Sequence, residues 1–304
     1  MILRSVLSLL LLLLLLLLIA LPLPAGAAAS VDDDHLAATE AWRSARYEAL
    51  KRPDGYLSFI GSGLVHEGES RVGSAPDSDI VLPKGPAWLG TLRLDSDGKT
   101  HFRSAPDGAG RIDGATFDDV ALKTQLDEGG PTRIDFDSAW FYVVRTGDLV
   151  GWRLRDLDSP LRAQFDGIPH FPVDRNWRIE AEWEPFDPPR TLEYLTVLGT
   201  PESGTVSGQA VFEHDGQRQV LWPMDAGEGR LFFVFADRSS GRSTYGGGRF
   251  LYADAPQNGR VVLDFNRAYN PPCALNGHVV CPTAPPENRL RILIEAGEKT
   301  PATP

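Results

Sequence analysis

A dense group of polar side chains lies near the C-terminal end of the 304-residue chain. The stretch from Tyr245 to Arg289 combines tyrosines, arginines and asparagines with two Pro-Pro pairs. Arginine donates hydrogen bonds in a planar fork, asparagine both donates and accepts, and a tyrosine ring can stack on a flat ligand. Prolines fix loop geometry and so lower the ordering cost of binding. Together these residue types indicate a site for a carboxylate, a phosphate or a sugar.

We expect eight residues of this stretch to bind the ligand. They are Tyr245, Arg249, Asn266, Arg267, Tyr269, Asn270, Asn288 and Arg289. The alternative interpretation is that the same groups bind one another, because a long loop must satisfy its own backbone polar groups. The sequence leaves both interpretations open.

Carboxylates in the same stretch raise a second possible function, a hydrolase. Asp264 and Glu287 are the candidate acid–base pair, with Asp237 and Glu298 in reserve. Two carboxylates about 5–10 Å apart in an open cleft would favour this enzyme. An Asp264 that pairs with a neighbouring arginine would favour a structural role. We therefore expect a non-catalytic ligand-binding or cell-envelope protein, with the hydrolase as the alternative.

Catalytic and cofactor motifs give no further candidate. The sequence has no Gly-x-Ser-x-Gly, His-Glu-x-x-His or Gly-x-x-x-x-Gly-Lys pattern, and its six histidines are scattered singly. Two cysteines are too few for a multi-thiolate zinc site, so we expect no metal and no cofactor. Cys273 and Cys281 enclose seven residues, and outside the cytoplasm such a pair is expected to form a disulfide.

The first 29 residues have the layout of a signal peptide. Met1–Arg4 gives a basic start, an apolar run extends from Val6 to Leu21, and small residues follow at Ala25–Ala29. The apolar run approaches membrane-spanning length, so an uncleaved anchor is the alternative. We expect cleavage, a periplasmic or secreted mature protein, and no membrane association after cleavage.

The charge balance restricts the partners. Removing residues 1–29 takes away one arginine and leaves 29 basic and 41 acidic residues, a net charge of −12. A general nucleic-acid binder needs a basic face, so no nucleic-acid partner is expected. The expected partner is a small anionic or carbohydrate ligand.

The mature chain reads as a helix followed by many short strands. Apolar residues that include Trp42 recur with helical spacing before a turn at Pro53, and we expect Trp42 to pack this helix on the first β domain. Strands spaced by about ten residues then continue to the end, without further helical periodicity. The predicted fold is mainly β, a sandwich or open barrel in two β domains. The predicted ranges are 30–156 for the helix and first domain, 157–172 for a connector, and 173–304 for the second domain.

Several motifs resemble the bacterial family called domain of unknown function 1684. The long motif Leu263–Cys273 is the most specific, and the loop Ala274–His278 departs from the family pattern. The other matching motifs are Trp42-Arg43-x-x-Arg46, Asp54–Leu57, Val81–Pro83, Phe171–Val173, Tyr245–Leu251, Cys281-Pro282, Pro285–Leu290 and Glu295–Lys299. The resemblance extends over essentially the whole mature chain and implies an exported bacterial protein. It implies no activity, because the family has none established.

A weaker resemblance concerns the first β domain. Arg71–Leu82 is similar to the opening of forkhead-associated phosphopeptide-binding domains. Ser74 stands where those domains have an arginine, and Pro86–Gly90 replaces their Ser-x-x-His motif. The resemblance supports a β-sandwich but not phosphothreonine binding.

Overall fold

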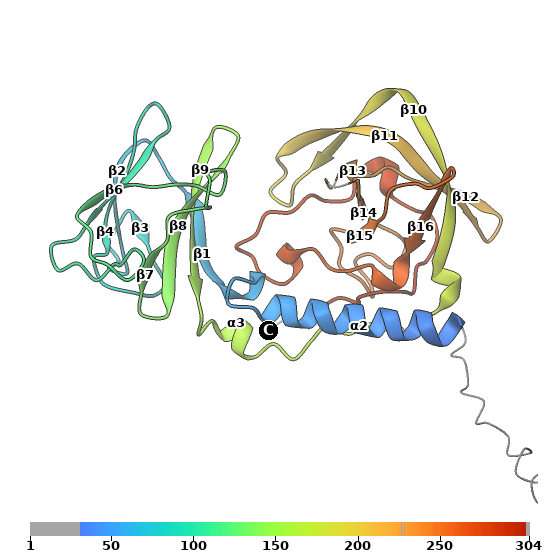
Figure 1. Cartoon of the computed structure of the whole chain (residues 1–304), viewed down its shortest axis with the longest axis horizontal. Coiled ribbons are helices and arrows are strands. Elements are labelled where there is room, and N and C mark those ends of the chain that lie inside the picture. The colour runs from blue at the N-terminus through green and yellow to red at the C-terminus, as the bar shows by residue number, and fades with distance from the viewer. Residues whose placement is uncertain (1–30, 226, 228, 302–304) are drawn as a thin grey trace, which may run out of the picture. The chain divides into compact units, whose positions relative to one another are not determined.

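The computed structural model describes residues 31–225, 227 and 229–301 (Figure 1). The predicted signal peptide lies outside these residues. The chain is mainly β with one long helix, α2 (Val31–Lys51), which confirms the predicted fold class. Residues from Thr39 onward form one compact unit. Within the described part of the chain, no helix is long and apolar enough to cross a membrane.

The first β region, residues 56–156, consists of two mainly antiparallel sheets with one apolar core. One sheet has the strand order β1-β9-β8-β7 and the other β3-β2-β4-β5-β6. Their bounds are β1 Phe59–Leu64, β2 Gly68–Gly73, β3 Ile80–Val81, β4 Gly90–Leu94, β5 Thr100–Ser104, β6 Asp119–Ala121, β7 Ile134–Phe136, β8 Ala139–Thr146 and β9 Leu149–Asp156, after the short 3-10 helix η1 Tyr56–Ser58. Only β3 pairs in parallel, with β2. Phe102, Phe141 and Leu154 are fully buried in this core.

β8 and β9 form a hairpin around Arg145–Asp148. β8 and β9 pair without interruption from Ala139 opposite Asp156 to Thr146 opposite Leu149. Gly147 adopts a positive φ of 55°, which a residue without a side chain reaches at little cost.

The second β region, residues 173–301, has a separate core. Its sheets have the orders β12-β11-β10-β16 and β13-β14-β15. The strands are β10 Arg178–Leu195, β11 Pro201–His214, β12 Gln217–Leu221, β13 Met224–Asp225, β14 Leu231–Phe235, β15 Arg249–Ala253 and β16 Arg260–Asp264. The short helix α3 Pro160–Ala163 precedes this region, and the short helices within it are η2 Arg175–Trp177, η3 Phe265–Arg267, η4 Pro272–Ala274 and η5 Pro286–Asn288. Phe233, Phe235, Leu263 and Phe265 are fully buried between the sheets. The domain boundary near residues 157–172 stays a prediction.

The pairing of β10 with β16 fixes which side chains share a face. Arg178 lies opposite Asp264, and Glu182 lies opposite Arg260. Because successive strand residues point to opposite faces, Ala181 and Leu263 enter the core while the charged residues remain on the outer face. The alternation in the sequence therefore produces a buried apolar face and a charged outer face.

The expected packing of the helix on the first β domain through Trp42 was wrong. The Trp42 ring lies 6.1 Å from the ring of Tyr269 in the second β region. Arg43 donates to the carbonyl of Phe171 at 2.9 Å, and Arg46 forms an ion pair with Glu298. The physical reason is electrostatic: Glu298 is 1% exposed, and a buried carboxylate requires a cationic partner.

Candidate functional site

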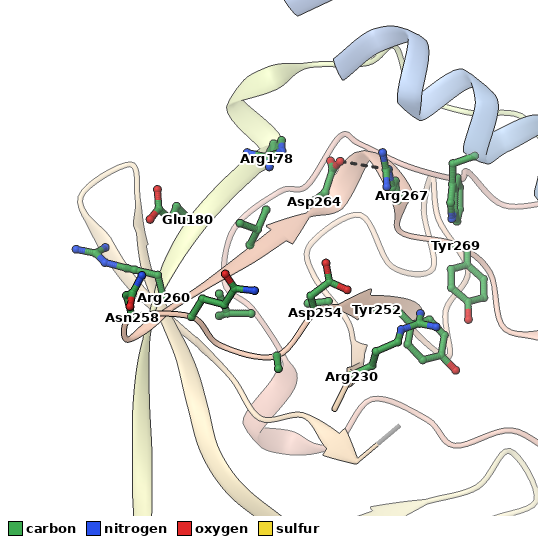
Figure 2. A pocket seen from close by; sticks show the side chains of 16 residues that line it. Arg178, Glu180, Arg230, Tyr252, Asp254, Asn258, Arg260, Asp264, Arg267 and Tyr269 are labelled. Carbon is green, nitrogen blue, oxygen red and sulfur yellow. Dashed lines mark ion pairs between the residues drawn. The ribbon is translucent and has the colours of Figure 1, made fainter. Parts of the chain in front are cut away.

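A groove of about 670 Å³ lies on the second β region (Figure 2). Its lining comes from the outer face of β10 and β16, from β15 and the turn that follows it, and from Arg230 and Trp42. The volume is within the range of about 300–1,000 Å³ that small-molecule sites occupy. The groove is therefore the candidate site.

Charged side chains dominate the groove. The arginines are Arg178, Arg230, Arg260 and Arg267, and the carboxylates are Glu180, Asp254 and Asp264. Asp264 forms an ion pair with Arg267 at 3.5 Å. The other three arginines have no carboxylate partner within the residues that the structure describes. Unpaired guanidinium groups on a concave surface can bind a carboxylate or a phosphate through two parallel hydrogen bonds.

Three aromatic side chains form a wall in the groove. The rings of Tyr252 and Tyr269 are nearly parallel, with an interplanar angle of 14° and centroids 6.4 Å apart, and Trp42 is tilted against Tyr269. Arg230 lies 4.4 Å above the centre of the Tyr252 ring. Burial raises the pKa of Tyr269, so its phenol stays neutral and cannot serve as a base near neutral pH. The wall can contact a ligand but offers no basic group.

Of the residues predicted from the sequence, Arg267, Tyr269 and the alternative Asp264 line the groove. Arg249 does not, because its side chain is fully buried. It forms an ion pair with Asp237 at 2.7 Å and donates to the carbonyls of Ile294, at 3.1 Å, and Ala296. Arg249 and Asp237 therefore hold the C-terminal loops together.

The three asparagines Asn266, Asn270 and Asn288 are also fully buried and bind the protein itself. The Asn288 amide accepts from the Trp222 N–H at 2.7 Å and donates to the carbonyl of the same residue at 2.8 Å. Asn266 makes the same two-way contact with the backbone of Asp174. The interpretation that these groups bind one another fits the asparagines.

Asn270 completes the network that holds the helix. Its backbone and side-chain N–H groups both donate to the Glu298 carboxylate, at 2.7 and 3.0 Å. Arg46 donates to the Asn270 carbonyl at 3.0 Å and also reaches Glu298. Glu298 is therefore committed to structure rather than to acid–base chemistry.

The remaining candidates lie outside the groove lining. Glu287 and Arg289 are exposed at η5, so the alternative pair of Asp264 and Glu287 is not assembled in the groove. The Tyr245 hydroxyl lies 4.0 Å from the Cys273 sulfur. Burial and the neighbouring thiol raise the pKa of Tyr245 to about 12. Tyr245 therefore contacts Cys273 and lies outside the groove lining.

The expected disulfide is not formed in the structure. Cys273 and Cys281 are both free thiols. The Cys281 sulfur accepts a hydrogen bond from the Cys273 backbone N–H at 3.2 Å, while the Cys273 sulfur faces Tyr245. The two thiols also contact each other, and the hydrogen bond between them lowers the pKa of Cys273 and raises that of Cys281. The loop between the two cysteines contacts the first β region: the Asn276 side chain donates hydrogen bonds to the carbonyls of Tyr56 and Phe59.

Six groove residues that contribute a charge or a tyrosine ring were not predicted from the sequence: Arg178, Glu180, Arg230, Tyr252, Asp254 and Arg260. In the sequence, Ile179, Ala181 and Trp183 alternate with glutamates, a pattern typical of a half-buried strand with one polar face. The pairing that places β16 beside β10 was not visible in the sequence. Within the described residues, no group of three or more His, Cys, Asp or Glu could hold a metal ion.

The fold and the groove define the class of protein. It is a mainly β protein with two separate apolar cores, and its second β region carries a charged groove with a wall of aromatic side chains. Residues 163–299 match the family model described as "Protein of unknown function (DUF1684)". This part of the chain belongs to that family, which confirms the resemblance of its motifs. The motifs of the first β region and of the helix lie outside the match.

Part of the chain is similar to solved structures. One of them is the solution NMR structure of an uncharacterized protein of Haloarcula marismortui, 29% identical in sequence. The similarity covers 46% of this chain and 79% of that protein, with a TM-score of 0.38. No curated protein matches the chain.

Proposed function

We propose that the second β region binds a small polar ligand with a negatively charged group in the groove. The observation that carries the proposal is the group of three arginines, Arg178, Arg230 and Arg260, without a carboxylate partner among the described residues. Acidic residues outnumber basic ones by 41 to 30 in this chain. Carboxylates are thus abundant, and three guanidinium groups left unpaired in one concavity indicate an anion site.

Binding is favoured over hydrolysis by the placement of the carboxylates. Asp264 is held by Arg267, and Glu287 lies outside the groove. An acid–base pair would need both carboxyl groups to face the same bound substrate. The predicted pair of Asp264 and Glu287 is therefore not assembled, and we assign the groove a binding role on the basis of its unpaired arginines.

A variant pair tests the proposal. Arg178→Ala combined with Arg260→Ala removes two groove cations, and Arg242→Ala is the control because Arg242 is exposed on the same region outside the groove. Calorimetric titration with acetate, hexuronates, inorganic phosphate and a sugar phosphate is expected to show saturable binding of at least one anion. The double variant should lose that binding and Arg242→Ala should keep it. Equal binding by both variants would contradict an anion site in the groove.

We also propose that the chain is exported and cleaved near residues 25–29. The support is the order of basic, apolar and small residues at the start of the sequence. N-terminal sequencing of protein recovered from the cell envelope or medium should begin close to Ser30. Recovery of the unprocessed chain from the cytoplasm would contradict export.

A further inference from the structure

We infer that the ligand of the groove is a saccharide with a single carboxylate per recognised unit, a hexuronate. This inference rests on the proposed binding function and names its ligand class. Three properties of the groove carry it: its charge balance, its unpaired acceptors and its aromatic wall.

The charge balance fits one negative charge. The four arginines face three carboxylates, which leaves a net charge of one positive unit in the groove. Arg267 and Asp264 neutralise each other. A ligand with several phosphates would meet Glu180 and Asp254 as well as the arginines, and like charges at short range repel. A single carboxylate matches the excess of one cation.

The unpaired carboxylates of the groove can accept hydrogen bonds from a ligand. The side chains of Glu180 and Asp254 have no hydrogen bond or ion pair within the part of the chain that is described. An ionised carboxylate can only accept hydrogen bonds. The neighbouring amides of Gln257 and Asn258 can both donate and accept. A sugar acid supplies both one anionic group and several donors, because its hydroxyls can donate to the carboxylates.

The aromatic wall completes the match to a sugar. Figure 2 shows Tyr252, Tyr269 and Arg230 at one end of the groove and Glu180, Asn258 and Arg260 at the other, with Asp254 between them. Tyr252 is 41% exposed and is held in place by Arg230 and Tyr269. A fixed aromatic surface contacts the C–H face of a pyranose ring at little ordering cost. The ring therefore lies toward Tyr252, and the carboxylate lies toward Arg178 and Arg260.

The test uses a matched set of probes on the full mature protein. The probes are digalacturonate, its methyl ester, a glucuronate-containing disaccharide and a sugar bisphosphate, each followed through the arginine side-chain N–H signals by NMR. At least one of the two hexuronate disaccharides is expected to bind saturably and to shift the groove arginines. Removing the charge by methyl esterification of digalacturonate should weaken its binding about tenfold or more, as loss of a charge-assisted contact of about 1.5 kcal/mol or more predicts.

Two variants assign the roles. Arg260→Gln should weaken hexuronate binding about tenfold and leave the methyl ester unchanged, since only the charged contact is lost. Asp254→Asn should weaken both saccharides and improve bisphosphate binding, because it removes a repelling charge. Both side chains are exposed, so thermal melts should coincide with that of the unmodified protein.

The possible outcomes distinguish a failure of the saccharide assignment from a failure of the proposed anion site. If the bisphosphate binds more tightly than either hexuronate and Arg260→Gln weakens it, the anion site stands and the saccharide assignment fails. If the methyl ester binds as well as the free acid, the carboxylate contact is wrong. If none of the probes shifts the groove arginines, both the saccharide and the anion site are contradicted.

Discussion

Arg249 and Arg260 occur in the same β region, yet they differ in nearly every physical respect. Arg249 is fully buried and bonds to Asp237 and to backbone carbonyls. Arg260 is exposed at the start of β16 and has no carboxylate partner in the described chain. The same residue type therefore holds loops together in one place and is available to a ligand in the other. Residue type alone does not indicate function, whereas burial and partners do.

The buried arginine illustrates the cost of desolvation. Burial pulls the pKa of Arg249 below its ordinary value, and the Asp237 carboxylate opposes that shift. The guanidinium begins so far above neutral pH that it remains charged. A charge in this position is tolerated because it has both a counter-ion and carbonyl acceptors.

The largest expected effect is therefore at Arg249. Arg249→Met leaves Asp237 as an unpaired buried carboxylate and should lower the free energy of unfolding by about 3–5 kcal/mol. Urea denaturation measures the loss, and Arg242→Ala, at an exposed position, should stay within about 0.5 kcal/mol. A loss below about 1 kcal/mol for Arg249→Met would mean that the buried pair does not hold this region.

Asn288 should give the next largest effect. Asn288→Ala leaves the Trp222 backbone groups and the Val234 carbonyl without their amide partner. Unsatisfied buried groups of this kind cost about 1–3 kcal/mol. The matched control is Asn176→Ala, at an exposed site. If both variants melt at the same temperature, the Asn288 amide is not needed to connect these loops.

The fold was largely predictable because it depends on local patterns. The β8–β9 hairpin follows from a turn with Gly147 between two β-rich runs, and β10 follows from its alternation. The position of the helix was not predictable. It depends on Glu298, which becomes buried only after distant segments have met, so a helix face that contains Trp42 could not reveal its partner.

The candidate site was harder to predict for a related reason. The asparagines at 266, 270 and 288 were predicted to bind a ligand because their side chains both donate and accept hydrogen bonds. The same chemistry satisfies buried backbone groups. The groove depends instead on cross-strand register, which brings Arg178 opposite Asp264 across 86 positions of sequence. Long-range pairing of this kind leaves no periodic signal in a single sequence.

The first β region offers a pH test of the same contrast between paired and unpaired charge. Burial alone would raise the pKa of Asp156, but hydrogen bonds from Ser138 and Lys84 outweigh it and lower that pKa below its ordinary value. A carboxyl group with a lowered folded-state pKa stabilises the protein above its unfolded-state pKa of about 3.9 and loses that contribution as pH falls through the folded value. Stability should therefore fall below about pH 4, and less steeply in Lys84→Met. If the free energy of unfolding falls with the same slope in the unmodified protein and in Lys84→Met as the pH decreases, Lys84 does not set this pKa.

The smallest expected effect on stability is at Arg267, in the groove. Its ion pair with Asp264 spans 3.5 Å, and its side chain is 37% exposed. Partly exposed ion pairs contribute about 0–1 kcal/mol to stability, so Arg267→Lys should shift the melting temperature little. Arg249→Lys should shift it strongly, because lysine cannot reproduce the several fixed donors of the buried arginine. For ligand binding the order reverses: Arg267→Lys should weaken anion binding in the groove slightly, and less than a change at the unpaired Arg260, because Asp264 already neutralises Arg267 and only the planar fork is lost. Thermal melts of Arg267→Lys and Arg249→Lys check the effect on stability, and calorimetric titration of the same two variants checks the effect on anion binding. A large thermal loss for Arg267→Lys would place Arg267 with the buried, structural arginine and would remove it from the binding site.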